Sequence, residues 1–246
     1  DAFFTEKGMR DRVEIKYVTP LSGAFTKPKA TQMLNGLMAE KNIEVIPDFY
    51  LASVDNEKKV IVSYDEKEVP FDLLITIPVN KGDKVIEKSG LADEDGLNFV
   101  PTDKSSLQSK KFNNVFVIGD TTNLPASKAG SVAHFEGEIL TENVISFINN
   151  KPLKATFDGH ANCFIETGYV KAALIDFNYT TEPLPGKFPL PAVGPMDLLK
   201  STWANHLGKL AFKWVYWHML LTGKSLPVST HMSMVGKIKE EEASLV

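Results

Sequence analysis

Length, composition and charge place this chain among ordinary globular proteins. It has 246 residues, of which 43% are hydrophobic and 24% charged, which is enough for one or two cores and too apolar for a disordered protein. A net charge of −4 gives no general attraction to nucleic acid, and a single cysteine excludes an internal disulfide framework. The five histidines make no metal-ligand spacing with carboxylates or with Cys163, so we predict no metal.

The first part of the chain alternates between helical and strand patterns. The expected elements are, in order, a helix end at 2–8 closed by Gly8, a strand at 13–18, a helix at 30–42, and strands at 43–46, 60–64 and 72–77. The last strand is apolar enough to lie inside a sheet. This alternation predicts an α/β layer. No GxGxxG occurs in this region, so the loop that would open a dinucleotide-binding domain is missing from the sequence.

The densest pattern is NNVFVIGDTTNLPASKAGSVAHFEGEILTENVISFINN, residues 114–150. It predicts a buried strand at 115–118 that ends at Gly119-Asp120, then a loop, then a helix that starts near Gly130. In such a turn Asp120 can accept hydrogen bonds from sugar hydroxyls, while the helix start at Gly130 and Ser131 offers free N–H groups. The alternative is a plain connection in which Asp120 satisfies local backbone donors. His134 and Glu136 are expected on the solvated face of the helix.

A hairpin is predicted next, with strands at 161–167 and 170–179 joined at Gly168. Cys163 lies in the first strand, where an inert packing thiol is the ordinary interpretation and a reactive thiol the alternative. His160 is either a proton carrier or, as the pattern favours, a surface histidine. Glu166 is a further candidate base, but it would face away from Cys163, because residues three apart in a strand point to opposite sides.

The C-terminal part combines a proline-rich connector with an amphipathic segment. Five prolines from Pro183 to Pro195 predict an extended connector. From 196 to 222, apolar residues at intervals of three and four predict a helix or a broken helix pair that carries all three tryptophans on one face, Trp203, Trp214 and Trp217. Its apolar run is too short to span a bilayer of ~30 Å. Flanking lysines fit a membrane interface, and a core helix or a dimer contact fits equally. Residues 226–246 predict a poorly ordered polar tail.

NVFVIGD, LPASKAG and the Asn-containing helix, together with FDGHANCFIETGYVKAALIDFNY, resemble the sulfide:quinone oxidoreductase family. These are flavoproteins with two dinucleotide-binding domains. The resemblance implies FAD, with Asp120 of the Gly119-Asp120 pair at the ribityl chain and the turn that follows at the pyrimidine end of the flavin ring. The residues of that turn are Lys128, Ala129, Gly130 and Ser131. It also implies that Cys163 is half of a redox pair whose partner lies outside this chain.

The family order implies three segments. Residues 1–78 would be the later part of the second, NAD-like domain, residues 79–150 the return to the FAD-binding domain, and residues 151–246 a β-hairpin with membrane-interface helices. The polar stretch at 79–112 would be the surface connection between the first two. We therefore predict an α/β fold, a partial double dinucleotide-binding-domain flavoprotein followed by a small β layer and C-terminal amphipathic helices. The chain would be a C-terminal fragment, inactive alone.

The first functional hypothesis is a sulfide:quinone oxidoreductase that passes two electrons from sulfide through FAD to quinone. It would be a peripheral, monotopic protein of a prokaryotic cell membrane, held through 196–222, with a homo-oligomer left open and nucleic acid not expected as a partner. One alternative is a type II NADH:quinone dehydrogenase, which Cys163 disfavours because hydride transfer needs no thiol. Another is a non-catalytic interaction module.

Overall fold

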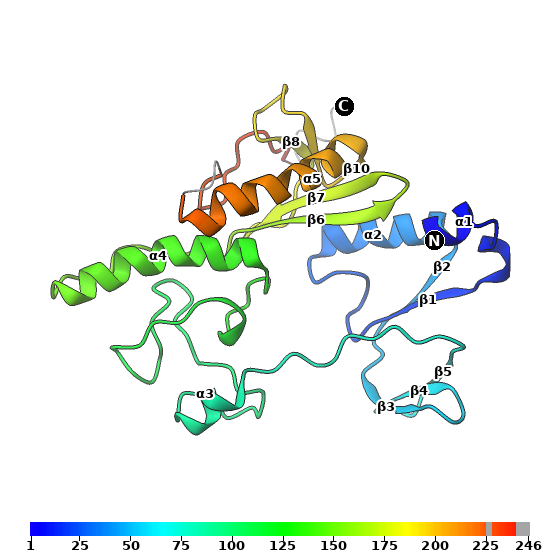
Figure 1. The fold of residues 1–246 in the computed structure, drawn as a ribbon, viewed down its shortest axis with the longest axis horizontal. Helices are drawn as coiled ribbons and strands as arrows, with labels where there is room; N and C mark the ends of the chain where they lie inside the picture. The colour runs from blue at the N-terminus through cyan, green and yellow to red at the C-terminus, as the bar shows by residue number, and fades with distance from the viewer. Residues whose placement is uncertain (225–227, 240–246) are drawn as a thin grey trace. The chain divides into compact units, whose positions relative to one another are not determined.

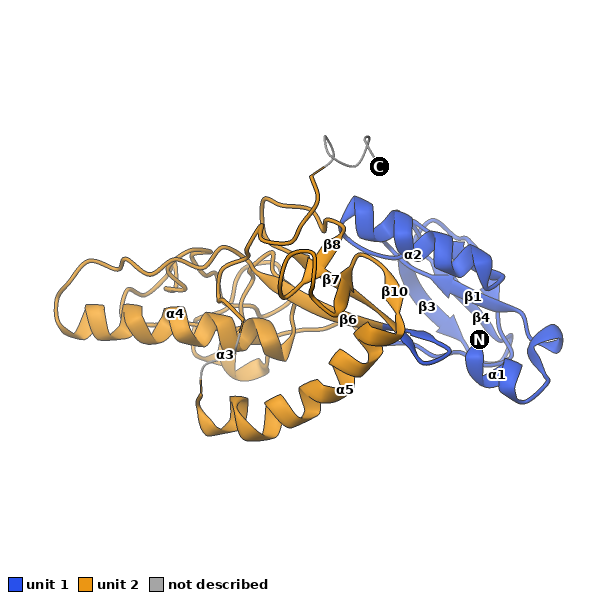
Figure 2. Cartoon of the chain, turned by 90° about the horizontal axis from the view of Figure 1, so that it is seen from above, with its two compact units in different colours: residues 1–78, 166–171 blue, residues 79–165, 172–246 orange. Residues whose placement is uncertain are grey.

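The computed structural model describes residues 1–224 and 228–239 and has an α/β fold (Figure 1). The chain forms two compact units (Figure 2). Unit 1 holds Asp1–Pro78 together with Glu166–Lys171, and unit 2 holds Val79–Ile165 and the described residues from Ala172 onwards. The assignment of these units to NAD-like and FAD-binding domains stays a prediction.

Unit 1 contains two small sheets and one long helix. Its elements are α1 (Ala2–Glu6), η1 (Arg10–Arg12), β1 (Ile15–Val18), α2 (Pro28–Glu40), β2 (Ile43–Ile46), β3 (Leu51–Asp55), β4 (Val60–Ser63) and β5 (Glu68–Pro70). β1 and β2 pair in parallel, and β3, β4 and β5 form an antiparallel sheet. Pro28 opens α2, where its fixed φ suits the first helical turn. Gly8 follows α1 with φ +61°, a left-handed conformation that glycine adopts without strain.

The helix and strands predicted at 13–18, 30–42 and 43–46 are confirmed, but the buried strand predicted at 72–77 is wrong. The strand that pairs with β4 on this side is β5, which precedes residues 72–77. The apolar side chains of Leu73, Ile75 and Ile77 are 75%, 88% and 84% exposed. An apolar run becomes a strand only beside another strand that takes up its N–H and C=O groups, and within the described residues none pairs with this stretch.

Unit 2 is built on a five-stranded sheet and two long helices. Its elements are α3 (Lys84–Lys88), η2 (Gly119–Thr121), α4 (Gly130–Ile148), β6 (Ala161–Gly168), β7 (Lys171–Phe177), β8 (Gly186–Phe188), β9 (Met196–Leu198), β10 (Ser201–Thr202), α5 (Trp203–His218) and η3 (Leu220–Thr222), with the tip of the β6–β7 hairpin counted in unit 1. The strand order is β10-β7-β9-β8, and β6 pairs with β7, which confirms the predicted hairpin.

The core of unit 2 is centred on β7. All of its residues after Lys171 are buried, which is the pattern of a strand covered on both faces. Val132, Phe135 and Ile139 of α4 are buried as well. Most of the 79–112 connection lies at or near the surface as predicted, except that Val100, Thr102, Leu107 and Ser109 are buried.

The prediction of a regular, buried strand at 115–118 is wrong. These residues are half-buried, and Phe116 forms only an isolated bridge with Gln108. A buried strand needs a continuous ladder on its two edges, and the described chain supplies only single bridges here.

The C-terminal part contains more sheet than its sequence predicted. The helix expected from residue 196 begins only at Trp203, where the Thr202 hydroxyl accepts a hydrogen bond from the Asn205 N–H at 3.2 Å, because residues 196–198 join the sheet as β9. The proline-rich connector contributes the edge strand β8.

The poorly ordered tail predicted for 226–246 is wrong over residues 228–239. The Lys187 N–H donates to the Gly236 carbonyl at 2.9 Å, and the Ile238 N–H donates to the Pro185 carbonyl at 2.9 Å. These bonds place the segment along the exposed edge of β8. Residues 226–227 and 240–246 lie outside the described residues.

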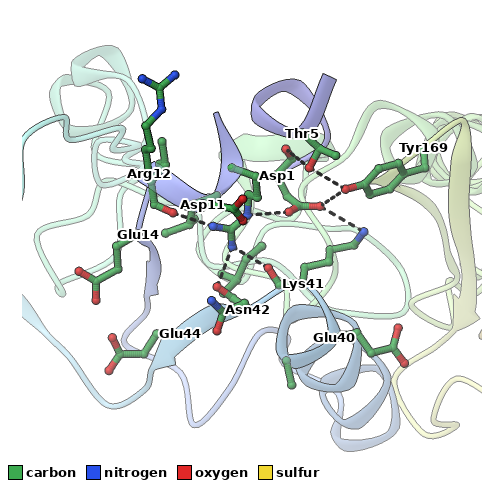
Figure 3. Close-up of a pocket in the computed structure, with 15 residues that line it drawn as sticks. Asp1, Thr5, Asp11, Arg12, Glu14, Glu40, Lys41, Asn42, Glu44 and Tyr169 are labelled. Carbon is green, nitrogen blue, oxygen red and sulfur yellow. Dashed lines mark hydrogen bonds and ion pairs between the residues drawn. The ribbon is translucent and has the colours of Figure 1, made fainter. Parts of the chain in front are cut away.

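An arginine closes the C-terminal end of α2. Arg10 Nη2 donates to the carbonyls of Lys41 and Asn42 at 2.7 and 2.8 Å, and its Nε donates to Asp1 Oδ1 at 2.9 Å. The other oxygen of Asp1 accepts from the Tyr169 hydroxyl at 2.9 Å and lies 3.6 Å from the Lys41 ammonium (Figure 3). Arg10 thus satisfies the carbonyls of the two residues that directly follow α2.

We expect Arg10→Met to destabilise unit 1 by about 2–3 kcal/mol, because several hydrogen bonds from a charged, largely buried group are lost together. Amide hydrogen exchange in α2 measures this directly. Arg12→Met is the matched control, since Arg12 is exposed in the same turn, and it should leave exchange unchanged. Equal protection of α2 in the two variants would contradict this role for Arg10.

Candidate functional site

The predicted Gly119-Asp120 turn is fixed to α4 by a buried carboxylate. The Gly119 N–H donates to Glu136 Oε2 at 2.6 Å, and Gly119 has φ +70°, which favours glycine at this position. Glu136 is buried, so its predicted place on a solvated face is wrong. His134, predicted on the same face, is half-buried, with Nε2 3.6 Å from Glu138 Oε1.

Burial raises the pKa of the Glu136 carboxyl above its usual range. The hydrogen bond from Gly119 and the charge of Lys128 oppose this shift, whereas the charge of Asp120 adds to it. Glu136 therefore holds the turn by accepting a hydrogen bond, although burial disfavours its charged form.

Asp120 is exposed, and its carboxylate accepts no hydrogen bond within residues 1–224 and 228–239. The predicted alternative, in which Asp120 satisfies local backbone donors, therefore has no hydrogen bond to support it among these residues. Its oxygens can instead accept hydrogen bonds from a ligand at the surface.

The start of α4 has open backbone donors. Ala129 precedes the helix and has no side-chain oxygen that could cap the first turn, so the N–H groups at Gly130 and Ser131 keep their hydrogen-bonding capacity. The space beside Gly130 is open. The ammonium of Lys128 donates to the Thr122 carbonyl at 2.6 Å and lies 4.6 Å from the centre of the Phe99 ring, and burial lowers its pKa. The backbone of this turn, more than the lysine charge, is what a ligand would meet.

The structure places Cys163 beside this turn. Its half-buried thiol lies near the Ser127 hydroxyl, and Ser127 is the residue directly before Lys128. Burial raises the pKa of the thiol, the charge of Asp176 raises it further, and the Ser127 hydroxyl opposes both. Glu166 is exposed, and its role as a base stays a prediction.

His160 is buried, and the prediction of a surface histidine is wrong. Its ring stacks on Phe135 of α4, with centroids 4.7 Å apart and planes 3° from parallel. Its Nε2 lies 2.7 Å from Asp176 Oδ1. Sequence reasoning missed Asp176, although one charged residue inside the apolar run AALIDF is a signal that could have found it, because a carboxylate in a central strand needs a partner.

A cavity of about 1060 Å³ lies in unit 1, around Asp1, Arg10, Lys41 and Tyr169 (Figure 3). These polar side chains bond to one another or to nearby carbonyls. Because their bonding groups are used internally, we assign no ligand to this cavity.

Helix α5 presents an apolar face to its surroundings. Trp203, Trp214 and Trp217 are 59%, 58% and 57% exposed, with Leu210 and Leu221 on the same side of the segment. Such exposure disfavours the predicted alternative in which this face packs into the core. Among the helices of residues 1–224 and 228–239, none combines the length and hydropathy needed to cross a membrane. In the same residues no cluster of His, Cys, Asp and Glu is arranged to hold a metal ion.

Comparison with solved structures shows the class of fold. The sulfide:quinone oxidoreductase of Aquifex aeolicus superposes with a TM-score of 0.67 at 20% sequence identity, over 87% of this chain and 52% of that one. The chain therefore has the α/β fold of this class of oxidoreductase. No protein-family model matches its sequence.

The related sequences are more specific. The mitochondrial sulfide:quinone oxidoreductase of Mus musculus is 31% identical over 231 residues, which are 91% of this chain and 49% of the mouse protein. That of Schizosaccharomyces pombe is 39% identical over 85% of this chain and 47% of the yeast protein. The chain is a homologue of sulfide:quinone oxidoreductases and spans about half of their length. These relatives are named mitochondrial, so the predicted prokaryotic membrane is not supported.

We expect Glu136→Gln to keep the Gly119 turn, with unchanged or slightly higher stability at neutral pH, because an amide oxygen can accept the same hydrogen bond without a buried charge. Glu136→Ala should cost about 2–3 kcal/mol, because it leaves the Gly119 N–H unpaired beside a cavity. Urea unfolding followed by tryptophan fluorescence reports on unit 2, which holds all three tryptophans.

The same variants have a pH signature. Folding raises the pKa of Glu136, so the folded chain holds its proton longer than the unfolded chain does. Stability should therefore fall as pH rises from the ordinary value of 4.5 through the raised pKa, and Glu136→Gln should lack this fall. Glu138→Gln, on the same helix, is the control. A glutamine variant as unstable as the alanine variant would count against the turn-holding role.

Proposed function

We propose that this chain is part of a sulfide:quinone oxidoreductase in which Cys163 is one half of the sulfide-accepting cysteine pair. The observation that carries the proposal is the position of the half-buried Cys163 thiol near Ser127. Ser127 directly precedes the turn at 128–131, whose open backbone donors suit a flavin. The names of the homologous proteins support the same reaction.

FAD is the cofactor that the site would hold. The exposed Asp120 carboxylate would accept hydrogen bonds from the ribityl hydroxyls, and the backbone of Lys128, Ala129, Gly130 and Ser131 would meet the pyrimidine end of the ring. When bound, FAD supplies a two-electron acceptor that can pass electrons to quinone. The glycine-rich pyrophosphate loop is missing from the sequence, so we expect this chain alone to bind FAD weakly and to be inactive.

The thiol chemistry needs a second cysteine from beyond this chain. In the proposed step, hydrosulfide attacks a disulfide between that cysteine and Cys163. The old S–S bond breaks, one sulfur becomes a persulfide, and the other leaves as a thiolate. The Ser127 hydroxyl can stabilise negative charge on the Cys163 sulfur by donating a hydrogen bond to it.

We further propose that α5 attaches the protein to a membrane surface. The exposed tryptophan face would enter the headgroup region, and Lys209 and Lys213 beside it would meet anionic lipid. Quinone, a membrane-soluble substrate, would then be accessible from the same surface. Neither the NADH:quinone dehydrogenase nor the interaction-module alternative is supported by the names of the relatives.

The function is tested in the longer, flavin-loaded protein with Cys163→Ser. We expect sulfide-dependent quinone reduction to be lost while FAD content stays near the parent value, because serine matches cysteine in size and lacks its nucleophilicity. An inert core thiol would instead give lower stability with unchanged turnover per folded molecule. Thr167→Ser in the same strand is the control and should remain active. Parent-rate oxidation of sulfide by the Cys163 variant would remove this residue from the mechanism.

The membrane proposal is tested with vesicles that contain anionic lipid. Lys209→Gln with Lys213→Gln should weaken binding by about 1 kcal/mol per lysine, and more at low salt. Because every tryptophan lies in α5, a fluorescence shift on vesicle addition reports insertion of this helix. Lys58→Gln with Lys67→Gln in unit 1 makes the same charge change elsewhere and should have no effect. Equal losses of vesicle binding in the two double variants would show that binding depends on net charge and not on α5.

A further inference from the structure

Two charged side chains join the turn at Gly119–Thr122 to the start of α4. Glu136 of α4 accepts a hydrogen bond from the Gly119 N–H at 2.6 Å, which fixes the residue where the turn begins. The ammonium of Lys128, in the loop just before α4, donates to the Thr122 carbonyl at 2.6 Å, which fixes the residue where the turn ends. The turn is therefore held at both ends.

The turn is closed by its own hydrogen bonds. The N–H and the hydroxyl of Thr122 both donate to the Gly119 carbonyl, at 3.1 and 2.9 Å. Thr122 is 2% exposed, whereas Asp120, which lies between these two residues, is exposed. Because these bonds link the two ends of the turn, whatever holds Thr122 also holds the backbone that carries the Asp120 carboxylate.

The ammonium of Lys128 has a second partner, the aromatic ring of Phe99. It lies 4.6 Å from the ring centre, within the distance at which the face of a ring attracts a cation. Lys128 as a residue is exposed, so either contact alone would compete weakly with water. The two contacts together restrict the position of the ammonium.

Other bonds hold the turn to a different part of unit 2. The Val100 N–H donates to the Thr121 carbonyl at 2.8 Å, and the Asn123 N–H donates to the Val100 carbonyl at 3.2 Å. These bonds fix the turn to residue 100 and leave its distance from the loop before α4 undetermined. The bond from Lys128 sets that distance at the end of the turn.

We propose that the side chain of Lys128 is a positioning residue, which holds the Asp120 turn against the loop where α4 begins. The exposed Asp120 carboxylate and the open N–H groups of Gly130 and Ser131 then keep a fixed separation. A ligand that contacts both, as the proposed flavin would, binds without first ordering this loop. The inference rests on the proposed function only for the identity of that ligand.

Direct contact between the ammonium and the cofactor is the competing explanation. In that case Lys128 and Asp120 would contribute to FAD binding independently, and the losses caused by removing each would add. A positioning role predicts coupled losses, because Lys128 acts through the carboxylate that it places. A purely structural role predicts an unchanged FAD affinity for each folded molecule.

The first measurement is amide hydrogen exchange in this chain. Lys128→Met should speed exchange at the Thr122 amide by about tenfold, because loss of a charged hydrogen bond lets the turn open more often. Lys111→Met is the matched control, since the Lys111 ammonium donates to the Ala92 carbonyl elsewhere in unit 2, and it should leave this amide unchanged. Lys128→Arg keeps a cationic donor and should restore most of the protection.

The second measurement is the FAD dissociation constant of the longer protein, obtained by titrating its flavin-free form. Lys128→Met should raise this constant by about tenfold. Asp120→Ala should raise it as well, and the double variant should match Asp120→Ala alone. Lys111→Met should bind FAD as the parent does. Circular dichroism checks folding, and Lys128→Gln replaces the methionine variant if that variant does not fold.

Three results would overturn the proposal. They are unchanged exchange at Thr122 in Lys128→Met, an arginine variant as open as the methionine variant, and FAD losses that add in the double variant. An unchanged affinity in Lys128→Met where Asp120→Ala weakens binding would leave only a structural role and would also overturn it. If Asp120→Ala binds FAD normally while Lys128→Met still opens the turn, the proposed flavin contact is wrong and the positioning of the turn stands. An active Cys163→Ser enzyme would refute the sulfide step alone.

Discussion

Asp176 places a negative charge in the most buried strand of unit 2, and the arrangement of that unit depends on how this charge is satisfied. An unpaired ion at such a position would cost several kcal/mol, so the fold must deliver cations to it. Lys237, near the end of the described chain, supplies an ammonium to Asp176 Oδ2, and the ring of His160 before β6 contacts Oδ1. Since Phe135 of α4 stacks on His160, the same charge also helps to fix the helix that begins at the site.

This constraint has a consequence for acid stability. The pKa of Asp176 is lower in the folded chain than its ordinary value of 3.8, so its contribution is present above that value and is lost as pH falls through the lowered pKa. Glu136 has the opposite sign, because its burial is opposed only by one backbone hydrogen bond and a partly buried lysine. Two buried carboxylates in one unit thus respond to pH in opposite directions, and the difference follows from the cations beside them.

The site joins three physical features at the start of α4. The helix start offers uncapped N–H groups, the Asp120 carboxylate is exposed, and the Cys163 thiol lies near Ser127 of the same loop. Each feature alone is common in proteins. Their combination is what the proposed reaction of a thiol beside a flavin would need. The homology to sulfide:quinone oxidoreductases covers about half of the length of those proteins.

The sequence by itself determined the elements whose signals are local. The helix at Pro28–Glu40, the strand at Ile43–Ile46, the helix from Gly130 and the β6–β7 hairpin follow from periodicity and from glycine and proline positions, which need no distant partner. Its motifs also indicated the family. Tertiary structure decided whatever depends on a partner far along the chain. The apolar runs at 72–77 and 115–118 form no regular strands, because a strand requires a neighbour that periodicity cannot supply. His160, Glu136 and Lys237 look like surface residues in sequence, but their side chains are buried in the structure. The Gly119 N–H that Glu136 accepts from and the Asp176 carboxylate that His160 and Lys237 contact lie at least 16 residues away.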